Sequence, residues 1–322
     1  MAGGTTWNTD FASLTVDNYV RESVQDQVFT DHGLMRWIER SVGVDRIRGG
    51  DNILIPLGTA EDSNGGSYSG YDTFDTDPSD TLAVAFYNWK QYQQPIIANA
   101  KEVLRNRSEE GVIDMWMTKA DVAMRSLRSK LNTHAFADGT GNSGKNILGL
   151  TILVDSAGTL GGLARSTATY WQANESAAGG ALAIDTSVGM LRLFNNCSTG
   201  SGDNSTPTML VTTQSVYEDY EHLLSPDLRH TSRQTGDGTF SGLAFKGVPL
   251  MWDDDATSGV MYMLNAGSLL FYIHPDRDFK TTEIAKADNG TLMQDAWIAH
   301  ILVWPEFIAA ECRRNGKLTG IV

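Results

Sequence analysis

The chain has 322 residues, of which 41% are hydrophobic and 20% are charged, and its formal net charge is −14. This length is enough for one large domain, or for two closely joined domains, with a sizeable core. The negative charge repels nucleic acid phosphates and argues against sequence-specific DNA binding, and no apolar run approaches the roughly 18 residues that a membrane span needs.

The first 48 residues are predicted to form an N-terminal arm. Valine recurs at every fourth position from Val16 to Val28, which is the spacing of a short amphipathic helix. The chain start lacks the basic residues and the continuous apolar stretch of a secretory signal, so we expect the protein to reside in a cytoplasm.

Residues 49–89 are predicted to form an extended two-stranded excursion. Residues 53–57 are apolar and β-branched, and residues 82–89 supply the β-branched and aromatic side chains of a return strand. An isolated two-stranded ribbon is only marginally stable in water. We therefore expect this long loop to lie on another surface.

Residues 106–136 give the strongest helix signal. Asn106 or Ser108 can cap the helix, acidic residues follow in the first turn, and basic residues lie towards its end, which matches the helix dipole. Roughly 28 residues at about 1.5 Å each span about 40 Å. This predicts a spine helix that crosses much of the molecule.

From residue 147 onward the pattern changes to short strands, glycines and shorter helices, so we place a boundary near residue 146. Helices are expected at about 186–195 and 214–224, and strands at 243–251, 260–264, 269–273 and 297–304. The fold class is therefore expected to be α+β.

The segment from Gly139 to Asn146 fits a GxGxxG pattern and most of a phosphate-binding P-loop. A P-loop must follow a strand and open a helix, so that the backbone N–H groups and the helix dipole meet the phosphate. Here the segment follows a helix and precedes a strand-like stretch, and Asn146 stands where the magnesium-binding hydroxyl is needed. A flexible connector is the favoured interpretation.

No other motif predicts a catalytic residue, a cofactor or a metal site. Asp253–Asp255 lacks the spacing of a calcium loop and is typical of a solvated turn. His222 and His230 form the one close histidine pair, and Tyr68 replaces the nucleophile of a hydrolase elbow. The two cysteines, Cys197 and Cys312, are too few for a disulfide framework and lack metal-ligand spacing.

An ordered set of short motifs resembles the major capsid proteins of tailed double-stranded DNA bacteriophages, which have the Hong Kong 97-type capsid fold. The resemblance covers nearly the whole chain and depends on the order of the motifs, because each one alone is unspecific. The motifs are residues 146–150, Gly161–Gly162–Leu163 with Arg165 and Trp171, Val211–Thr213 before a helix with Tyr217 and Tyr220, residues 245–250 leading to Asp253, and Met261–Asn265.

The resemblance implies a division of the chain and a mode of assembly. The expected parts are an N-terminal arm (1–48), an extended loop (49–89), a peripheral domain with the spine helix (90–146), an axial domain (147–265) and a return to the peripheral domain (266–322). Such subunits form pentamers and hexamers of an icosahedral shell around DNA in the bacterial cytoplasm. A portal, a separate scaffolding protein and a decoration protein are the other implied partners, and no membrane is involved.

Two departures from relatives carry expectations. Some relatives join their subunits by an isopeptide bond from a loop lysine, but residues 49–89 contain neither Lys nor Arg. We therefore expect no covalent crosslink. Some relatives also carry a cleaved scaffolding segment of about a hundred residues at the N-terminus, whereas about fifty residues precede the loop here, so we expect the scaffolding protein to be separate.

The extended loop holds seven acids and no base. These acids either belong to a solvated loop or pair with basic residues on the spine helix of an adjacent subunit. Exposed pairs contribute about 0 to 1 kcal/mol each, and a closed shell repeats them many times. The contact candidates are the acids Asp51, Glu61, Asp62, Asp72, Asp75, Asp77 and Asp80, the bases Arg105, Arg107, Arg125, Arg128 and Lys130, and the aromatic anchors Tyr68, Tyr71 and Phe74.

Three alternatives remain open. An encapsulin-like nanocompartment would have the same fold and would hold enzymes in place of DNA. A nucleotide-binding enzyme would use Gly139–Lys145, and a minor virion component would occur in few copies.

Overall fold

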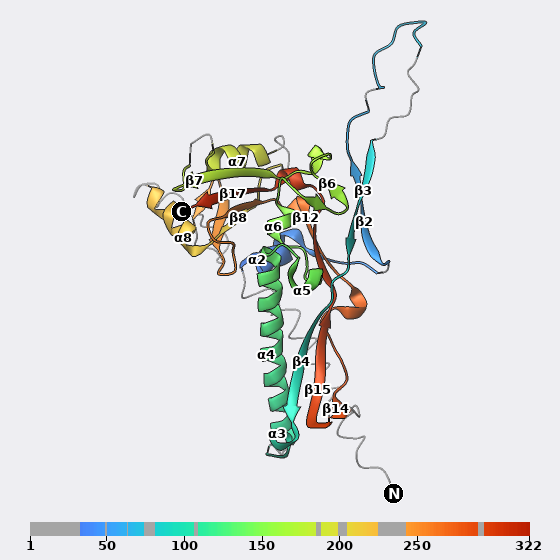
Figure 1. Cartoon of the computed structure of the whole chain (residues 1–322), viewed down its shortest axis with the longest axis vertical. Coiled ribbons are helices and arrows are strands. Elements are labelled where there is room, and N and C mark those ends of the chain that lie inside the picture. The colour runs from blue at the N-terminus through green and yellow to red at the C-terminus, as the bar shows by residue number, and fades with distance from the viewer. Residues whose placement is uncertain are drawn as a thin grey trace.

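The structure is a computed structural model that describes residues 33–48, 50–62, 64–73, 81–105, 109–184, 188–198, 205–224, 243–288 and 293–322. The helix predicted around residues 16–28 lies outside these ranges. Figure 1 shows an elongated molecule, in which a strand hairpin extends from one end and a long helix from the other. Within the described chain no helix is long and apolar enough to cross a membrane.

The predicted spine helix is confirmed as α4 (Glu109–Phe136), which has 28 residues. It follows the short helix α3 (Ala100–Arg105) and packs along β4 (Tyr92–Asn99). Strand β4 pairs with β15 (Met293–Val303), whose other edge pairs with β13 (Lys280–Thr281) and β14 (Ala285–Asp288). The buried side chains of α4 recur every three or four residues, as a helix that packs one face requires: Trp116, Ala120, Ala123, Leu127 and Leu131.

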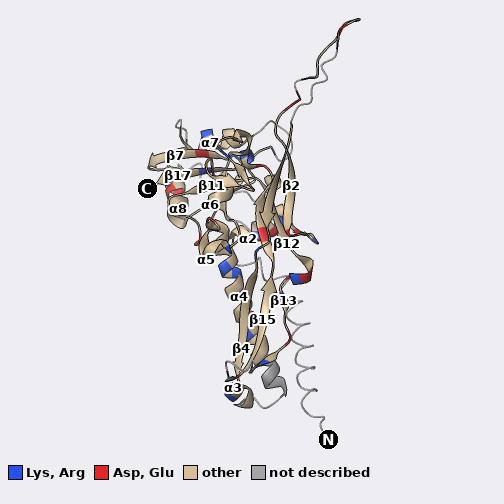
Figure 2. Cartoon of the chain, turned by 45° about the vertical axis from the view of Figure 1, so that its right-hand side comes forward, with Lys and Arg blue, Asp and Glu red and all other residues tan. Residues whose placement is uncertain are grey.

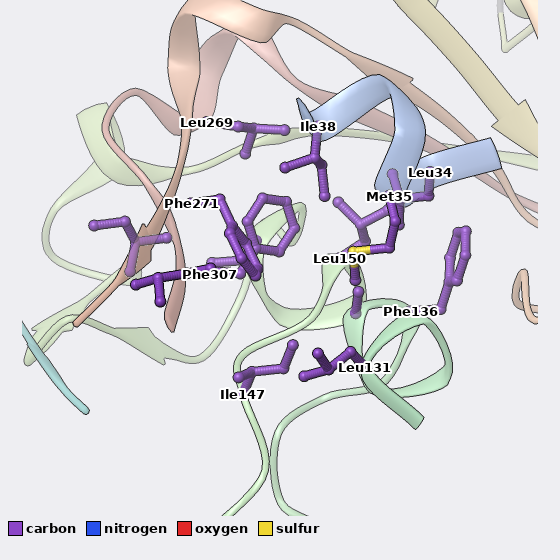
Figure 3. Close-up of a cluster of buried hydrophobic side chains, with 14 of the residues drawn as sticks. Leu34, Met35, Ile38, Leu131, Phe136, Ile147, Leu150, Leu269, Phe271 and Phe307 are labelled. Atoms are coloured by element: carbon purple, nitrogen blue, oxygen red, sulfur yellow. The ribbon is translucent and has the colours of Figure 1, made fainter. Parts of the chain in front are cut away.

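The main hydrophobic core lies where the end of α4 meets three short helical segments and a three-stranded sheet (Figure 3). In this close-up, Leu131 and Phe136 of α4 face Ile147, Leu150 and the aromatic pair Phe271 and Phe307. The elements around this core are α2 (Gly33–Trp37), the π-helical turn η1 (Ile38–Val42), α6 (Leu150–Leu153), and a three-stranded sheet of β1 (Val44–Arg46), β12 (Leu269–Ile273) and β16 (Pro305–Ala309).

A six-stranded sheet forms the other half of the molecule, and both of its faces are covered. In β11 (Met261–Leu264), Met261 and Met263 face a second core, which lies under the helices α7 (Met190–Cys197) and α8 (Gln214–Leu223). Tyr262 and Leu264 of the same strand face the main core. The strands, in spatial order, are β7 (Asn174–Gly180), β17 (Gly316–Ile321), β11 (Met261–Leu264), β8 (Met209–Thr212), β10 (Val248–Trp252) and β9 (Ala244–Phe245).

Three expectations differ from the structure in detail. Helix α7 begins four residues later than predicted, at Met190. The strand predicted at 243–251 is two strands, because Lys246 and Gly247 have φ angles of 51° and 83° and form the tight turn between β9 and β10. The segment 266–322, expected to return to the peripheral domain, ends in β17, which instead pairs with β7 and β11.

The resemblance motif at residues 161–171 forms a compact corner. Gly161 and Gly162 turn the chain between β5 (Thr159–Leu160) and β6 (Leu163–Ala164). Arg165 is fully buried, and its guanidinium donates hydrogen bonds to four backbone carbonyl groups. Short helices complete the described fold: α5 (Gly141–Gly144), η2 (Thr169–Trp171), η3 (Ala266–Ser268), η4 (Pro275–Arg277) and η5 (Cys312–Arg314).

Candidate assembly surface

The hairpin that projects from the body consists of β2 (Asn52–Gly58) and β3 (Leu82–Asn88). The strands are antiparallel, with Asn52 opposite Asn88 and Gly58 opposite Leu82, which confirms the two predicted strands. In Figure 1 the hairpin stands beside the six-stranded sheet, and its loop reaches well beyond the body.

One face of the hairpin is packed on the body. Ile53, Leu57, Ala85 and Tyr87 are all less than 10% exposed. The Tyr87 hydroxyl donates a hydrogen bond of 3.1 Å to the carbonyl oxygen of Ala309 in β16. The base of the hairpin is therefore fixed to the main core.

The opposite face is apolar and exposed. Strand side chains alternate between the two faces, so the register places Leu54 beside Phe86 and Pro56 beside Val84 on this side. Their exposed fractions are large, at 64% for Leu54, 73% for Leu82, 52% for Val84 and 49% for Phe86. We call Leu54, Pro56, Leu82, Val84 and Phe86 the outer stripe.

The free edge of β2 carries a proline. The Phe86 N–H donates to the Gly161 carbonyl oxygen at 3.1 Å, so Phe86 does not use its N–H to bond Leu54, the residue opposite it in β2. In an antiparallel pair of this kind, the N–H and carbonyl groups of Leu54 also point outward, to the free edge of β2. Two residues further on, Pro56 also faces the edge, but it has no N–H group. This gap in the row of donors favours docking through the face of the hairpin over pairing along its edge.

The acids of the hairpin loop are exposed where the structure describes them (Figure 2). Asp62 accepts a hydrogen bond from the Asn64 N–H, and Asp72 accepts one from the Ser69 N–H, so both help to shape the loop. Within the described ranges Asp51, Glu61, Asp62 and Asp72 form no ion pair with the same subunit. Asp75, Asp77 and Asp80 lie outside the described residues.

The aromatic anchors predicted for the loop are also exposed. The exposed fractions are 67% for Tyr68 and 105% for Tyr71. Phe74 lies outside the described residues. The two tyrosines therefore have the accessibility that contact with another subunit requires.

The predicted basic partners that the structure describes belong to α3 and α4, and Arg125, Arg128 and Lys130 lie in the second half of α4, which leads towards the main core (Figure 1). Arg125 and Lys130 are exposed, and the Lys130 ammonium donates to the Gln94 side chain at 2.9 Å. Arg128 is only 3% exposed and is not accessible to a loop of another subunit. Arg105 ends α3, and Arg107 lies outside the described residues.

The segment resembling a P-loop forms a connector, as favoured. It follows α4, and in it Asn142 and Ser143 have φ angles of 53° and 58°. The helix after it, α6, has only four residues and begins beyond Gly149, so residues 139–146 do not open directly into a helix as a P-loop does. The stretch after it is the short helix α6, not the strand that the sequence indicated.

The aspartate run is part of a polar network. The Asn132 side chain of α4 donates to Asp253 at 2.9 Å and to Asp255 at 2.7 Å. Thr133 also donates to Asp255 at 2.9 Å. Across the described chain, no group of three or more His, Cys, Asp or Glu side chains could hold a metal ion.

The outer stripe is not among the contact candidates that the sequence predicts. Those candidates are charged and aromatic loop residues, whereas Leu54, Leu82 and Val84 lie in stretches that predict only strands. One signal for it is present in the sequence: both strands are apolar on both faces, whereas a two-stranded hairpin that packs on its own subunit covers only one face.

No family model and no curated protein matches the sequence. Solved structures do match over most of the chain. The cyanophage A-1(L) capsid asymmetric unit has a TM-score of 0.65 at 15% identity, covering 89% of this chain and 92% of that one. The capsid of Myoviridae phage XM1 has a TM-score of 0.53 at 13% identity, covering 84% and 86%. The SrpI encapsulin of Synechococcus elongatus has a TM-score of 0.55 at 9% identity, covering 91% and 88%.

These solved structures have the same arrangement of helices and strands as this chain over nearly its whole length. Their sequence identities are low, so the likeness shows the fold and nothing more. The chain therefore has the α+β fold of phage capsids, as its ordered motifs predicted.

Proposed function

We propose that the chain is the major capsid (head) protein of a tailed bacteriophage, which self-assembles into an icosahedral shell enclosing double-stranded DNA. The observation that carries this proposal is the hairpin: its inner face is anchored to the main core and its outer stripe exposes four large apolar side chains. Contiguous apolar surface of this kind is typical of a protein interface.

The energetics of the outer stripe suit repeated self-association. Covering side chains that are about half exposed contributes roughly 1 kcal/mol or more each. One hairpin alone gives a modest contact, but every subunit of a closed shell both donates and receives such a contact. Many shallow contacts then add up to a stable particle.

Charge is the second part of the proposed contact. The loop of the hairpin projects away from the body, whereas the exposed bases Arg125 and Lys130 lie on α4, which runs from the body in the other direction, so a pairing between the loop acids and these bases would join two copies. We propose that loop acids of one subunit approach the α4 surface of the next. Tyr68 and Tyr71 would add apolar area at the same place.

The proposed role is structural and not catalytic, with no cofactor. The net charge of −14 fits a container that holds DNA without sequence-specific binding. The partners implied by the resemblance complete the proposal: pentamers and hexamers of the chain itself, a separate scaffolding protein, a portal and a decoration protein. The proposed location is the virion capsid, after assembly in the cytoplasm of the bacterial host.

The decisive experiment is electron microscopy of the expressed chain, alone and with the scaffolding protein of the same phage. We expect closed shells of uniform diameter in at least one of the two preparations. Protein that stays monomeric in both preparations, at every concentration tested, would contradict the proposal.

An encapsulin-like compartment is the second candidate, and the likeness to the SrpI encapsulin favours it. Absorbance at 260 nm of particles purified from the natural source separates the two functions. Phage heads contain DNA and absorb strongly at this wavelength, whereas a compartment that holds enzymes has the spectrum of protein.

The loop chemistry predicts the state of the chains in mature shells. Because residues 49–89 offer no lysine, we expect denaturing electrophoresis to show a single monomer band. A ladder of covalent oligomers would contradict this prediction.

A further inference from the structure

The connector between α4 and α6 is held in place by side chains from other parts of the fold. At its end, Gly149 lies so close to the carbonyl groups of His134 and Ala137 that a Cβ atom would overlap them. At its tip, the Lys90 ammonium donates a hydrogen bond of 2.7 Å to the Gly144 carbonyl oxygen. Lys90 directly follows the hairpin, so the connector and the hairpin base are linked.

Two consecutive N–H groups of the connector bind titratable side chains. The Ile147 N–H donates to the Tyr92 hydroxyl oxygen at 3.0 Å, and the Leu148 N–H donates to Oε1 of Glu306 at 3.1 Å. Tyr92 begins β4 and Glu306 lies in β16. The segment that leads from the spine helix to the rest of the chain is thus fastened to both strands.

The Tyr92 hydroxyl also lies 2.8 Å from Nδ1 of His134 on α4. Because the hydroxyl oxygen accepts from Ile147, its proton is available for the imidazole. This arrangement needs a neutral histidine with an unprotonated Nδ1. A proton on Nδ1 would leave the hydroxyl proton of Tyr92 without its acceptor.

Glu306 is fully buried, and only one of its carboxyl oxygens is bonded in the described structure. Oε1 accepts from Leu148 and from the N–H of Phe307, while Oε2 has no hydrogen-bond partner among the described residues. An ionised carboxylate with a bare oxygen in the core is costly, whereas a carboxylic acid is tolerated there.

We propose that Glu306, Tyr92 and His134 form a proton-sensitive latch, which fastens the connector while Glu306 carries a proton and releases it when Glu306 ionises. The latch lies within a single subunit. It can therefore be tested whether or not the chain forms shells, and its failure would leave the proposed function intact.

Burial raises the pKa of Glu306 from an ordinary 4.5 to about 8, and the two N–H bonds and Lys90 oppose this only in part. When the latch opens, the carboxyl group meets water and regains its ordinary pKa. Opening then releases a proton between pH 4.5 and 8, so the open population rises with pH by up to about tenfold per pH unit and is constant above 8.

Histidine works in the opposite direction at lower pH. Burial, and then Lys130, lower the pKa of His134 below its ordinary 6.5, so opening takes up a proton at pH values between the lowered pKa and 6.5. In that interval the proton taken up by His134 offsets the proton released by Glu306. The net dependence on pH is therefore weakened just below 6.5 and steep between 6.5 and 8.

The other ionisable groups in or near the latch are two tyrosines, a cysteine, an arginine and a lysine. Burial raises the pKa of Tyr92 to about 12 and also raises the pKa of Tyr87, and Glu306 adds a smaller contribution to both. Arg165 and Cys312 lie near Tyr87, and burial raises the pKa of the Cys312 thiol to about 11. Lys90 is the base that faces Glu306.

The test measures amide hydrogen exchange of the peptide that contains Ile147 and Leu148, on the unassembled full chain from about pH 5 to about pH 9, corrected for the intrinsic pH dependence of exchange. The unaltered chain should lose protection by up to about tenfold per pH unit between 6.5 and 8. Glu306→Gln should abolish this dependence, and His134→Gln should extend it to lower pH.

Glu311→Gln is the matched control, because Glu311 is only partly buried and pairs with Arg313 and Arg314. It should keep the profile of the unaltered chain. A profile that is flat in the unaltered chain, or that persists in Glu306→Gln, would overturn the latch.

A second measurement does not depend on any variant folding. Infrared difference spectra of the unaltered chain should contain the carbonyl band of a buried carboxylic acid, which disappears as the pH is raised through about 8. Absence of this band at pH 6.5 would equally overturn the latch, because Glu306 would then be ionised in the closed state.

Discussion

The hairpin β2–β3 and the six-stranded sheet use the same kind of strand in different ways. Leu210 in β8 and Leu54 in β2 both lie in short apolar runs, yet Leu210 is fully buried and Leu54 is 64% exposed. The sheet has a core on each face, with α7 and α8 on one side and the end of α4 on the other. The hairpin is packed on the body through one face, and from the outer stripe the Phe86 ring approaches the body at Gly162.

The comparison separates the apolar surface that folding uses from the apolar surface that remains for assembly. Side chains of the sheet are buried within one chain, so changes there alter the stability of the single subunit. Side chains of the outer stripe gain less from folding, and the proposed function predicts that changes there act on the contact between copies.

The largest expected effect is on the sheet. Leu210→Ala should lower the free energy of unfolding of the unassembled subunit by about 2 to 5 kcal/mol, because it leaves a cavity in a packed core. Val84→Ala on the outer stripe, where the side chain is 52% exposed, should cost less than about 1 kcal/mol. Urea unfolding measures both, and equal losses would remove the distinction between the two regions.

A smaller effect is expected where the hairpin meets the body. Gly162 has a φ of 80°, and a Cβ atom there would overlap the Phe86 ring, so Gly162→Ala should cost about 1 to 3 kcal/mol. Gly158→Ala is the matched control, because its φ is 77° and its Cβ would have no neighbour within 4 Å. Thermal unfolding should show the larger loss for Gly162→Ala. Equal losses would mean that backbone strain alone, and not the approach of Phe86, matters here.

The outer stripe should tolerate a charge in the free subunit and not in the shell. Leu82→Asp should change the unfolding free energy of the subunit by no more than about 0.5 kcal/mol, since the side chain is 73% exposed. It should nevertheless prevent shell formation, as measured by sedimentation. Leu82→Met keeps an apolar side chain of similar size and should still assemble. Assembly of Leu82→Asp at the level of the unaltered chain would show that this face is not an interface.

The smallest effect concerns the loop acids. Salt at about 1 M reduces the Debye length to about 3 Å, so shells without covalent crosslinks should dissociate faster than in dilute salt. Glu61→Gln should weaken this dependence slightly, because each exposed pair contributes about 0 to 1 kcal/mol. Indifference of the shells to salt would remove the electrostatic part of the contact and leave the outer stripe.

The parts of the fold that the sequence predicts well are those with a strong local pattern. The spine helix has a buried side chain every three or four residues and was placed within three residues of both ends of α4. The strands of the hairpin were predicted because β-branched and aromatic residues cluster there. Local propensity and packing agree in both places.

Features that depend on distant contacts could not be predicted. Strand β17 pairs with β11 and β7, from which it is separated by about fifty or more residues, and nothing local marks this pairing. The exposure of Leu54 and Leu82 depends on where the body ends. Glu306 lies in an apolar run, and only the structure brings Leu148 to its carboxyl group. The sequence thus predicts the two strands of the hairpin but not the exposed apolar face that they present.

Pro56 has a consequence for the subunit before it meets a shell. If the proposed function holds, a cell would contain many copies of this chain at once, each with a projecting ribbon whose free edge could template the next copy into a fibre. A residue without a main-chain donor interrupts such growth at its first step. The hairpin can therefore keep its exposed apolar face, because Pro56 disfavours the pairing of strand edges into fibres and leaves docking through the face possible.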